Sequence, residues 1–481
     1  MIQLPPLTWW QQEEVDKYAL EPRRGIFWGP RCRKTRAAIA SMLAAGYRRG
    51  IVVAPLTVCP QWHRLLENGY GLTVVPAYKI ARGKLISELL TKGGNYVVVI
   101  PWKSIRSKNE SERSNGRASR VEVLLRKFVT EKALILDESH VMASPSSHQA
   151  CAARLLAKDA AWVRLLTGTP VPSHYGGLWG QLVALHPTEF ETSYGAFAAR
   201  YLIRNEYMFN RVEGHTSLVE SELRPKMNRY VSIRRRVDLF GPDTFEEEDR
   251  ELEMPPGART MYDEFAKNYI LTGDLNVSAP QILTRLMRLH QIAQGFITDQ
   301  TGSDQHIHSE KLIAVVEDIE RIVVSGEKVV VFHTYDWERL SLLMRLGRRK
   351  DFGVPVYTMH GGTKVADREK LLLAMEEPGS KIAIIQTKTG GTGVSLAEVP
   401  YQLVMSETFD YTTQEQRHDR TYNPGIARFI TYYRMKGTID EYIAFVLRTK
   451  QTFHQAIMNA DREQLVFGMI PRQRLHKRSL T

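Results

Sequence analysis

Two adjacent carboxylates at the end of an apolar run are the side chains in this sequence best suited to chemistry. The run reads Leu134-Ile-Leu-Asp137-Glu138-Ser-His140, which predicts a buried strand that ends in a polar loop. Asp137 can hold Mg²⁺ through water while Glu138 activates an attacking water, as nucleotide hydrolysis requires. The alternative is two solvated carboxylates after a buried strand, which a phosphate-binding loop elsewhere in the chain would disfavour.

Such a loop stands upstream, between a predicted strand and a predicted helix. It reads Trp28-Gly-Pro-Arg-Cys-Arg-Lys34-Thr35. Lys34 would reach the β and γ phosphates, Thr35 would bind Mg²⁺, and the helix N-terminus would supply N–H donors. Arg33 replaces the usual glycine, and a side chain at positive φ there costs about 1–2 kcal/mol. Either the loop is reshaped, with Arg31 or Arg33 supplying charge in cis, or the site has decayed.

The elements that must position these residues are short β-branched runs alternating with helical stretches, the pattern of a parallel sheet covered by helices. The expected strands are 25–28, 50–54, 96–100, 133–136 and 163–166, then 328–332, 354–359, 381–386 and 401–406. Ligands of such sheets bind at the carboxyl ends of the strands. The sequence therefore predicts an α/β protein with two parallel-sheet lobes.

The expected domains follow from where this alternation stops and resumes. We expect a first lobe at 1–187, a helical insert at 188–300, a second lobe at 301–447 and a helical basic tail at 448–481. The insert contains the run Ser232-Ile-Arg-Arg-Arg. Its arginines fit a solvated helix face and DNA contact equally well.

Composition excludes several classes of protein. Lys and Arg outnumber Asp and Glu by 65 to 53, for a net charge of +12, which favours a polyanionic partner. Three cysteines, Cys32, Cys59 and Cys151, without CxxC or clustered histidines, support neither a disulfide framework nor a metal site. The sequence has no apolar run of membrane-spanning length and no secretion signal, so we expect a cytoplasmic protein.

The chain also resembles the Swi/Snf-like branch of the superfamily-two helicases, particularly compact bacterial and phage members. The motifs behind this resemblance occur in the family's order along nearly the whole chain. They are Leu7-Thr-Trp-Trp-Gln11 (Q motif), Ile51-Val-Val-Ala-Pro55 (Ia), Asp137-Glu-Ser-His140 (II), Leu166-Thr-Gly-Thr-Pro170 (III), Val330-Val-Phe-His333 (IV), His360-Gly-Gly362 with Arg368, Thr389-Gly-Gly391-Thr-Gly393 (V) and Gln416-Arg-His-Asp-Arg420 (VI).

The resemblance implies two RecA-like lobes with ATP and Mg²⁺ bound between them, and a DNA-dependent ATPase that translocates on duplex or branched DNA or remodels bound structures. It implies a bacterial cell or a phage-infected host and leaves a protein partner open. The implied hydrolytic residues are Lys34, Asp137, Glu138 and Arg420. The implied nucleotide contacts are Gln11, Arg33, Lys34, Thr35, Gln416 and Arg420, with Mg²⁺ at Thr35 and Asp137. The implied DNA contacts are Pro55, Thr167, Thr169, Gly362, Thr389, Gly391 and Gly393.

One departure from the family falls in motif VI. The family places a second arginine three residues after Arg420, where this chain has Asn423. Such an arginine can contribute ~10³-fold or more to turnover. Two interpretations follow from Arg33 and Asn423: an active DNA-dependent ATPase, or an ATPase-impaired pseudo-helicase that binds nucleic acid or protein. The resemblance adds a third, an RNA-directed relative, because superfamily two contains many RNA helicases.

Overall fold

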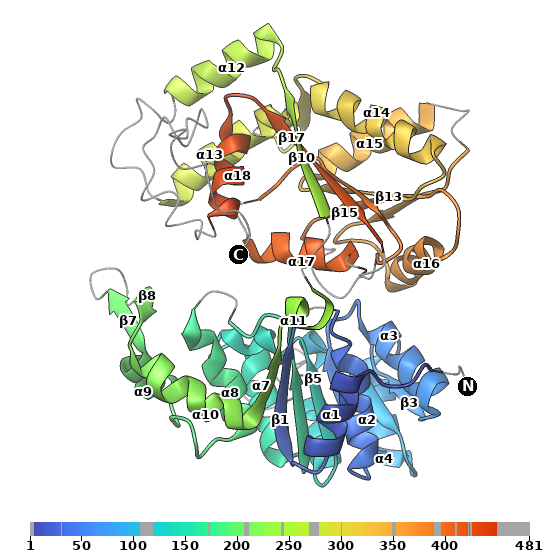
Figure 1. The fold of residues 1–481 in the computed structure, drawn as a ribbon, viewed down its shortest axis with the longest axis vertical. Coiled ribbons are helices and arrows are strands. Elements are labelled where there is room, and N and C mark those ends of the chain that lie inside the picture. Colours follow the sequence, from blue (N-terminus) through green and yellow to red (C-terminus); the bar gives the residue numbers. More distant parts are fainter. Residues whose placement is uncertain are drawn as a thin grey trace. The chain divides into compact units, whose positions relative to one another are not determined.

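The computed structural model describes residues 4–29, 31–105, 119–171, 174–205, 211–241, 245–268, 279–299, 301–348, 353–388, 396–408, 411–421, 423 and 426–449. The chain divides into two compact units, Met1–Pro242 and Asp243–Thr481. Each unit is built on one main parallel sheet with helices packed against it (Figure 1). The expected fold class of two parallel-sheet α/β lobes is confirmed.

The first unit has a seven-stranded sheet in the order β3-β4-β2-β5-β6-β1-β9, with every pairing parallel. Alternate residues of its strands face two different cores: Ile51 and Val53 pack into one, Val52 and Ala54 into the other. This double burial explains the continuous apolar runs in the sequence. The strands are β1 (Arg23–Trp28), β2 (Gly50–Ala54), β3 (Val74–Pro76), β4 (Val97–Pro101), β5 (Ala133–Asp137), β6 (Trp162–Leu166) and β9 (Val231–Arg234).

Helices cover both faces of this sheet. Residues of α1, α2 and α3 join one core, and residues of α6 to α10 join the other (Figure 1). A small antiparallel hairpin, β7 (Leu202–Asn205) with β8 (Arg211–His215), lies outside the main sheet. The helices are α1 (Trp9–Tyr18), α2 (Lys34–Ala44), α3 (Cys59–Arg64), α4 (Arg82–Thr91), α6 (Arg120–Val129), α7 (His148–Asp159), α8 (Trp179–Leu185), α9 (Tyr194–Tyr201), α10 (Arg224–Tyr230) and α11 (Arg236–Phe240).

The second unit has a six-stranded parallel sheet in the order β10-β17-β16-β13-β15-β14, and a small hairpin of β11 and β12. Its strands are β10 (Phe245–Leu252), β11 (Phe296–Thr298), β12 (Asp304–His306), β13 (Val329–His333), β14 (Val356–Met359), β15 (Ile382–Gln386), β16 (Tyr401–Val404) and β17 (Arg428–Met435). Its helices are α12 (Pro256–Ala266), α13 (Ala279–Gln294), α14 (Glu310–Val324), α15 (Asp336–Arg348), α16 (Val365–Glu376), α17 (Tyr411–Thr421) and α18 (Ile439–Arg448).

A buried polar cluster joins α13, α14 and α18 in this unit. The Lys311 ammonium lies 2.5 Å from Asp440 Oδ2 and donates to Gln294 Oε1 at 2.8 Å. The Gln294 amide donates to the other oxygen of Asp440 at 3.0 Å. Nearby, His290 Nδ1 lies 2.9 Å from the Tyr335 hydroxyl. The cluster therefore satisfies a buried charge pair with further hydrogen bonds, which a buried ion pair needs in order to be tolerated.

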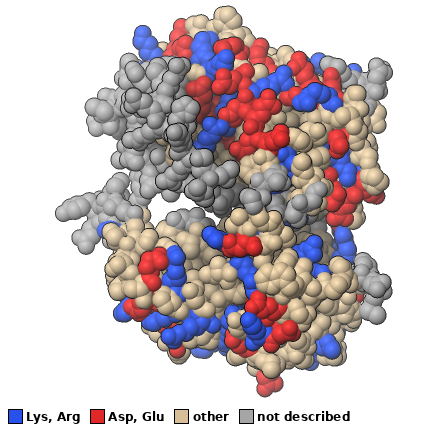
Figure 2. Space-filling model, in the orientation of Figure 1, with Lys and Arg blue, Asp and Glu red and all other residues tan. Residues whose placement is uncertain are grey.

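The edge strand β10 carries a run of acidic side chains. These are Glu246, Glu247, Glu248, Asp249 and Glu251. Figure 2 shows Asp and Glu gathered over the second unit where β10 runs in Figure 1. Charged side chains on an edge strand oppose pairing with a second chain.

The nine predicted strands are all present, with ends shifted by at most two residues. Four strands of the two main sheets, β3, β9, β10 and β17, were not predicted. The segment 188–300 differs from a separate helical insert, because β9 pairs with β1 in the first unit and β10 pairs with β17 in the second. The boundary between the units therefore falls near residue 242. Both partners of these strands are distant in the sequence, so local periodicity did not reveal them.

Candidate functional site

The loop between β1 and α2 has an unusual backbone. Arg31 and Arg33 both adopt positive φ, 63° and 58°. Arg33 is the residue that caps α2, in the left-handed region at ψ 39°. The backbone shape predicted at the usual glycine position is therefore present, although an arginine must adopt it. Residues held in this region cost of order 1–3 kcal/mol and cluster at functional sites.

Several buried groups hold this loop in place. From α1, the Trp10 indole donates to the Cys32 carbonyl at 3.1 Å, and the Gln11 amide donates to the Arg33 carbonyl at 2.9 Å. On the other side, the Gly29 N–H donates to the Arg234 carbonyl of β9 at 2.8 Å. These hydrogen bonds offset the strain by fixing the loop from both flanks.

The Lys34 ammonium points back into the loop that precedes it. It donates to the carbonyl oxygens of Trp28 at 2.9 Å and Gly29 at 3.1 Å. The two carbonyl oxygens are neutral acceptors, which compensate the full charge of the Lys34 ammonium only in part. Phosphate oxygens would form stronger, charge-assisted bonds with the same ammonium.

The two carboxylates lie at the end of β5 as predicted. Asp137 is 7% exposed and accepts from the Trp62 indole at 2.8 Å and from the Glu138 N–H at 3.0 Å. Glu138 is partly exposed and adopts a left-handed backbone, φ 53° and ψ 49°. The strained turn separates the two side chains, so that one is buried and the other remains accessible.

The pKa values of the two carboxylates are also shifted in opposite directions. Burial, and then the charge of Glu138, raise the pKa of Asp137 to about 6, although the Lys34 charge opposes this shift. Burial also acts to raise the pKa of Glu138, but His140 and Lys34 outweigh it and the net shift is downward. Glu138 is therefore ionised at neutral pH, while Asp137 lacks a cation in contact with it among the described residues.

His140 connects Glu138 to the loop after β6. Its Nδ1 lies 3.2 Å from Glu138 Oε2, 3.1 Å from the Thr167 hydroxyl and 3.4 Å from the Thr169 hydroxyl. The Thr169 N–H also donates to the Thr167 hydroxyl at 3.1 Å. A change in the position of either threonine therefore affects the Glu138 carboxylate through the His140 imidazole.

Two family models match the chain across these elements. The model described as "SNF2-related domain" matches residues 31–296, more than half of the 481 residues. The model described as "Helicase conserved C-terminal domain" matches residues 311–425. The chain belongs to the SNF2-related family. The predicted resemblance to Swi/Snf-like helicases is thereby confirmed.

Curated relatives of this SNF2-related chain are distant in sequence. YwqA of Bacillus subtilis (strain 168), a candidate ATP-dependent helicase/translocase, is 24% identical over 85% of this chain and 43% of its own length. Protein CHROMATIN REMODELING 19 of Arabidopsis thaliana is 22% identical over 85% of this chain and 62% of its own. The chain thus spans less than two thirds of either relative.

Among solved structures, the Sulfolobus solfataricus SWI2/SNF2 ATPase core in complex with dsDNA aligns with 96% of this chain and 97% of its own length, at 18% identity and a TM-score of 0.43.

The predicted residues of the first unit lie at one edge of its sheet. The loop carrying Lys34 and Thr35 follows β1, Pro55 follows β2, Asp137 ends β5 and Thr167 follows β6. Because all these strands are parallel, their carboxyl ends share an edge. Gln11 lies close by, but its amide contacts the Arg33 carbonyl and Thr8, so an adenine contact stays a prediction.

The predicted residues of the second unit are placed only in part. Gly362 follows β14 in an exposed turn. Arg420 is buried in α17, and its carbonyl accepts from the Leu396 N–H at 2.9 Å. The side chain of Gln416 lies outside the described residues, as do Thr389, Gly391, Gly393 and the tail from residue 450 onward. Their roles stay predictions.

Three residues of the site were not predicted as functional. Trp62 contacts the Asp137 carboxylate, and the Trp102 indole donates to the Asp137 carbonyl at 2.8 Å. Gln181 contacts the turn after Glu138 from α8. None of the three left a signal in the sequence, because Trp62 and Trp102 lie 75 and 35 residues from Asp137 in the chain and a single glutamine in a helix forms no pattern.

The donor groups at this site suit a hard cation. Thr35 offers a hydroxyl and Asp137 a carboxylate, the oxygen ligands that Mg²⁺ prefers alongside waters and substrate phosphates. Within the described ranges, no three His, Cys, Asp or Glu side chains gather as a metal site. Two protein ligands fit a Mg²⁺ ion that arrives with a nucleotide better than an all-protein cage.

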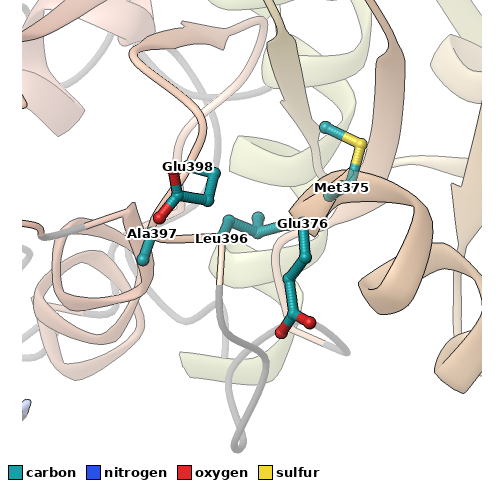
Figure 3. Close-up of a pocket in the computed structure, with 5 residues that line it drawn as sticks. All are labelled: Met375, Glu376, Leu396, Ala397 and Glu398. Atoms are coloured by element: carbon teal, nitrogen blue, oxygen red, sulfur yellow. The ribbon is translucent and has the colours of Figure 1, made fainter. Parts of the chain in front are cut away.

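A separate pocket in the second unit does not suit a nucleotide. Its volume is about 240 Å³, and Figure 3 shows its lining by Met375, Glu376, Leu396, Ala397 and Glu398. Two carboxylates on a small pocket repel phosphate groups, and typical ligand pockets are larger, at ~300–1,000 Å³.

In the part of the chain that the structure describes, no helix is long and apolar enough to span a membrane.

Proposed function

We propose that this SNF2-related chain is an ATP-dependent DNA translocase or helicase-like remodeller, which couples ATP hydrolysis to movement on duplex or branched DNA. The observation that carries the proposal is the grouping of Lys34, Asp137 and Glu138 at one edge of the first sheet, close enough for the Lys34 charge to act on both carboxylates. The names of the relatives, one for an ATP-dependent helicase/translocase and one for chromatin remodelling, support the same function.

The first unit's residues have distinct roles in this function. Lys34 exchanges loop carbonyls for phosphate oxygens, and the N–H groups at the start of α2 bind the same phosphates. Thr35 and Asp137 hold Mg²⁺, which neutralises developing charge on the phosphates when bound. Glu138 is ionised and partly exposed, so it orients the attacking water and accepts its proton.

The contacts from Glu138 through His140 to Thr167 and Thr169 connect the site of hydrolysis to the proposed DNA-binding residues. The two threonines, with Pro55, are the proposed contacts to the DNA backbone, where hydroxyl and N–H groups bind phosphate oxygens. DNA that shifts the threonines changes the position of His140 and, through it, of Glu138. DNA-stimulated turnover follows from this connection.

The test is steady-state ATP hydrolysis at low salt, with and without duplex DNA, for the wild type and Glu138→Gln. We expect stimulation by duplex DNA and a loss of turnover of about 10²–10⁴-fold in the variant, because its amide cannot accept the proton. Structured RNA serves as the competing polymer. Failure of DNA to stimulate at any salt concentration, or stronger stimulation by RNA, contradicts the proposal.

A second candidate function is that of a pseudo-helicase that binds nucleic acid or protein without efficient turnover. Arg33 in a left-handed conformation within the phosphate loop and Asn423 in place of an arginine favour it. Asn423→Arg separates the two functions. A silent wild type that gains turnover in this variant, or stays silent and indistinguishable from Lys34→Ala, supports the pseudo-helicase. A wild type that is already stimulated supports the motor.

A further inference from the structure

The turn that follows Glu138 packs unusually closely against α8. A Cβ atom added at Gly180 would lie 2.7 Å from the carbonyl oxygen of Met142, so only glycine permits this approach. The next residue, Gln181, is fully buried and faces the same turn. The close approach therefore places a polar side chain of α8 against Ser139, the residue that follows Glu138.

Gln181 uses both ends of its amide. Its Oε1 accepts from the Ser139 hydroxyl at 2.8 Å, and Ser139 is itself fully buried. Its Nε2 donates to the carbonyl oxygen of Pro170 at 3.0 Å and to that of Gly177 at 3.3 Å. Since carbonyl oxygens only accept, these contacts determine the orientation of the amide.

These contacts form a second link between the Glu138 turn and the loop after β6. The first link runs through His140 to the hydroxyl of the buried Thr167. The second runs through the buried Ser139 and Gln181 to the carbonyl oxygen of Pro170, three residues further along the same loop. Glu138 holds a strained backbone between them, and a strained residue keeps its position only when its surroundings over-determine it.

We propose that Gln181 is a positioning residue, which holds the Glu138 turn and the Thr167–Pro170 loop in a single arrangement and thereby transmits the binding of DNA to hydrolysis. This inference rests on the proposed DNA-dependent ATPase. Gln181 is fully buried and its amide bonds to Ser139, Pro170 and Gly177, so its loss affects the geometry of Glu138 and leaves the Lys34 loop intact.

The experiment compares Gln181→Met with the double variant Ser139→Ala/Gln181→Met. Methionine has a similar volume but cannot form either hydrogen bond. In both variants we expect the DNA-stimulated kcat to fall about tenfold with the KM for ATP within about twofold of wild type, because a small displacement of a catalytic group lowers the rate strongly. The double variant leaves no unpaired Ser139 hydroxyl, so it should melt at a higher temperature than Gln181→Met.

Ser119→Ala is the matched control, because Ser119 is also a fully buried serine of the first unit and caps α6 by accepting from the Glu122 N–H. It should lower the melting temperature and keep the stimulated kcat. A double variant that DNA stimulates as strongly as the wild type overturns the positioning role of Gln181 and leaves the proposed function standing. A wild type that DNA does not stimulate overturns the proposed function, and the positioning role with it.

Discussion

Asp137 of the first unit and Asp440 of the second are both buried aspartates, 7% and 6% exposed, with opposite electrostatics. Burial, and then the charge of Glu138, raise the pKa of Asp137 to about 6, although the hydrogen bonds that it accepts from the Trp62 indole and the Glu138 N–H oppose this shift. Asp440 is buried as well, but the charge of Lys311 outweighs that burial and lowers its pKa. A buried carboxylate that already has its cation is structural, whereas one without a cation is prepared to receive one.

Removing the charge of Asp440 gives the largest expected effect of this comparison on stability. Asp440→Asn leaves the Lys311 ammonium buried without its counter-ion, and we expect a loss of about 3–5 kcal/mol in the free energy of unfolding. Denaturant unfolding measures it, and hydrogen exchange of α13, α14 and α18 locates it. A loss below about 1 kcal/mol would show that the cluster is not structural.

Acid should destabilise the second unit through two buried histidines. Burial lowers the pKa values of His290 and His333 to about 4 each, against about 6.5 when unfolded. The unfolded chain therefore binds more protons between these values, so stability present above pH 6.5 is lost as pH falls towards 4. We expect about 2 kcal/mol from each histidine.

Unfolding measured from pH 7.5 to 4.5 tests this expectation, again with hydrogen exchange to assign the change to the second unit. His290→Gln should flatten the pH dependence by less than half, because His333 and the buried His308, whose pKa burial also lowers, continue to titrate. An unchanged slope in this variant would mean that His290 does not remain neutral in the folded chain.

Asp137→Asn should have the smallest effect and the opposite sign. A raised pKa means that the contribution of this group is favourable below about pH 4 and is lost as pH rises through about 6. The pKa shift of Asp137 is worth about 3 kcal/mol at pH 8. A neutral asparagine accepts weaker hydrogen bonds from the Trp62 indole and the Glu138 N–H, so the variant should be about 1 kcal/mol more stable than wild type without nucleotide. Calorimetry measures the shift. The variant should also lose the stabilisation that Mg²⁺ with ATP gives to the wild type, and a lower melting temperature would place Asp137 with Asp440 as structural.

Much of the fold could be predicted because the signal was local. Apolar runs such as Ile51 to Val53 indicated strands buried on both faces, and the residues at their ends indicated the phosphate loop and the carboxylate pair. The strands β9 and β10 were missed because each is short or strongly charged and pairs with a strand roughly 200 residues away. The Gln181 link was missed for the same reason, since a contact across 42 residues leaves no periodic pattern.

The sequence by itself determined which chemical groups are available and on which loops they stand: Lys34 and Thr35 after one strand, Asp137 and Glu138 after another. Only the tertiary structure decided their state. Asp137 and Asp440 are the same residue type at similar burial, and their pKa values move in opposite directions because Lys311, 129 residues from Asp440 in the chain, contacts one and no cation contacts the other among the described residues. The energy of a charge depends on its surroundings in space, and folding brings those together from distant parts of the chain.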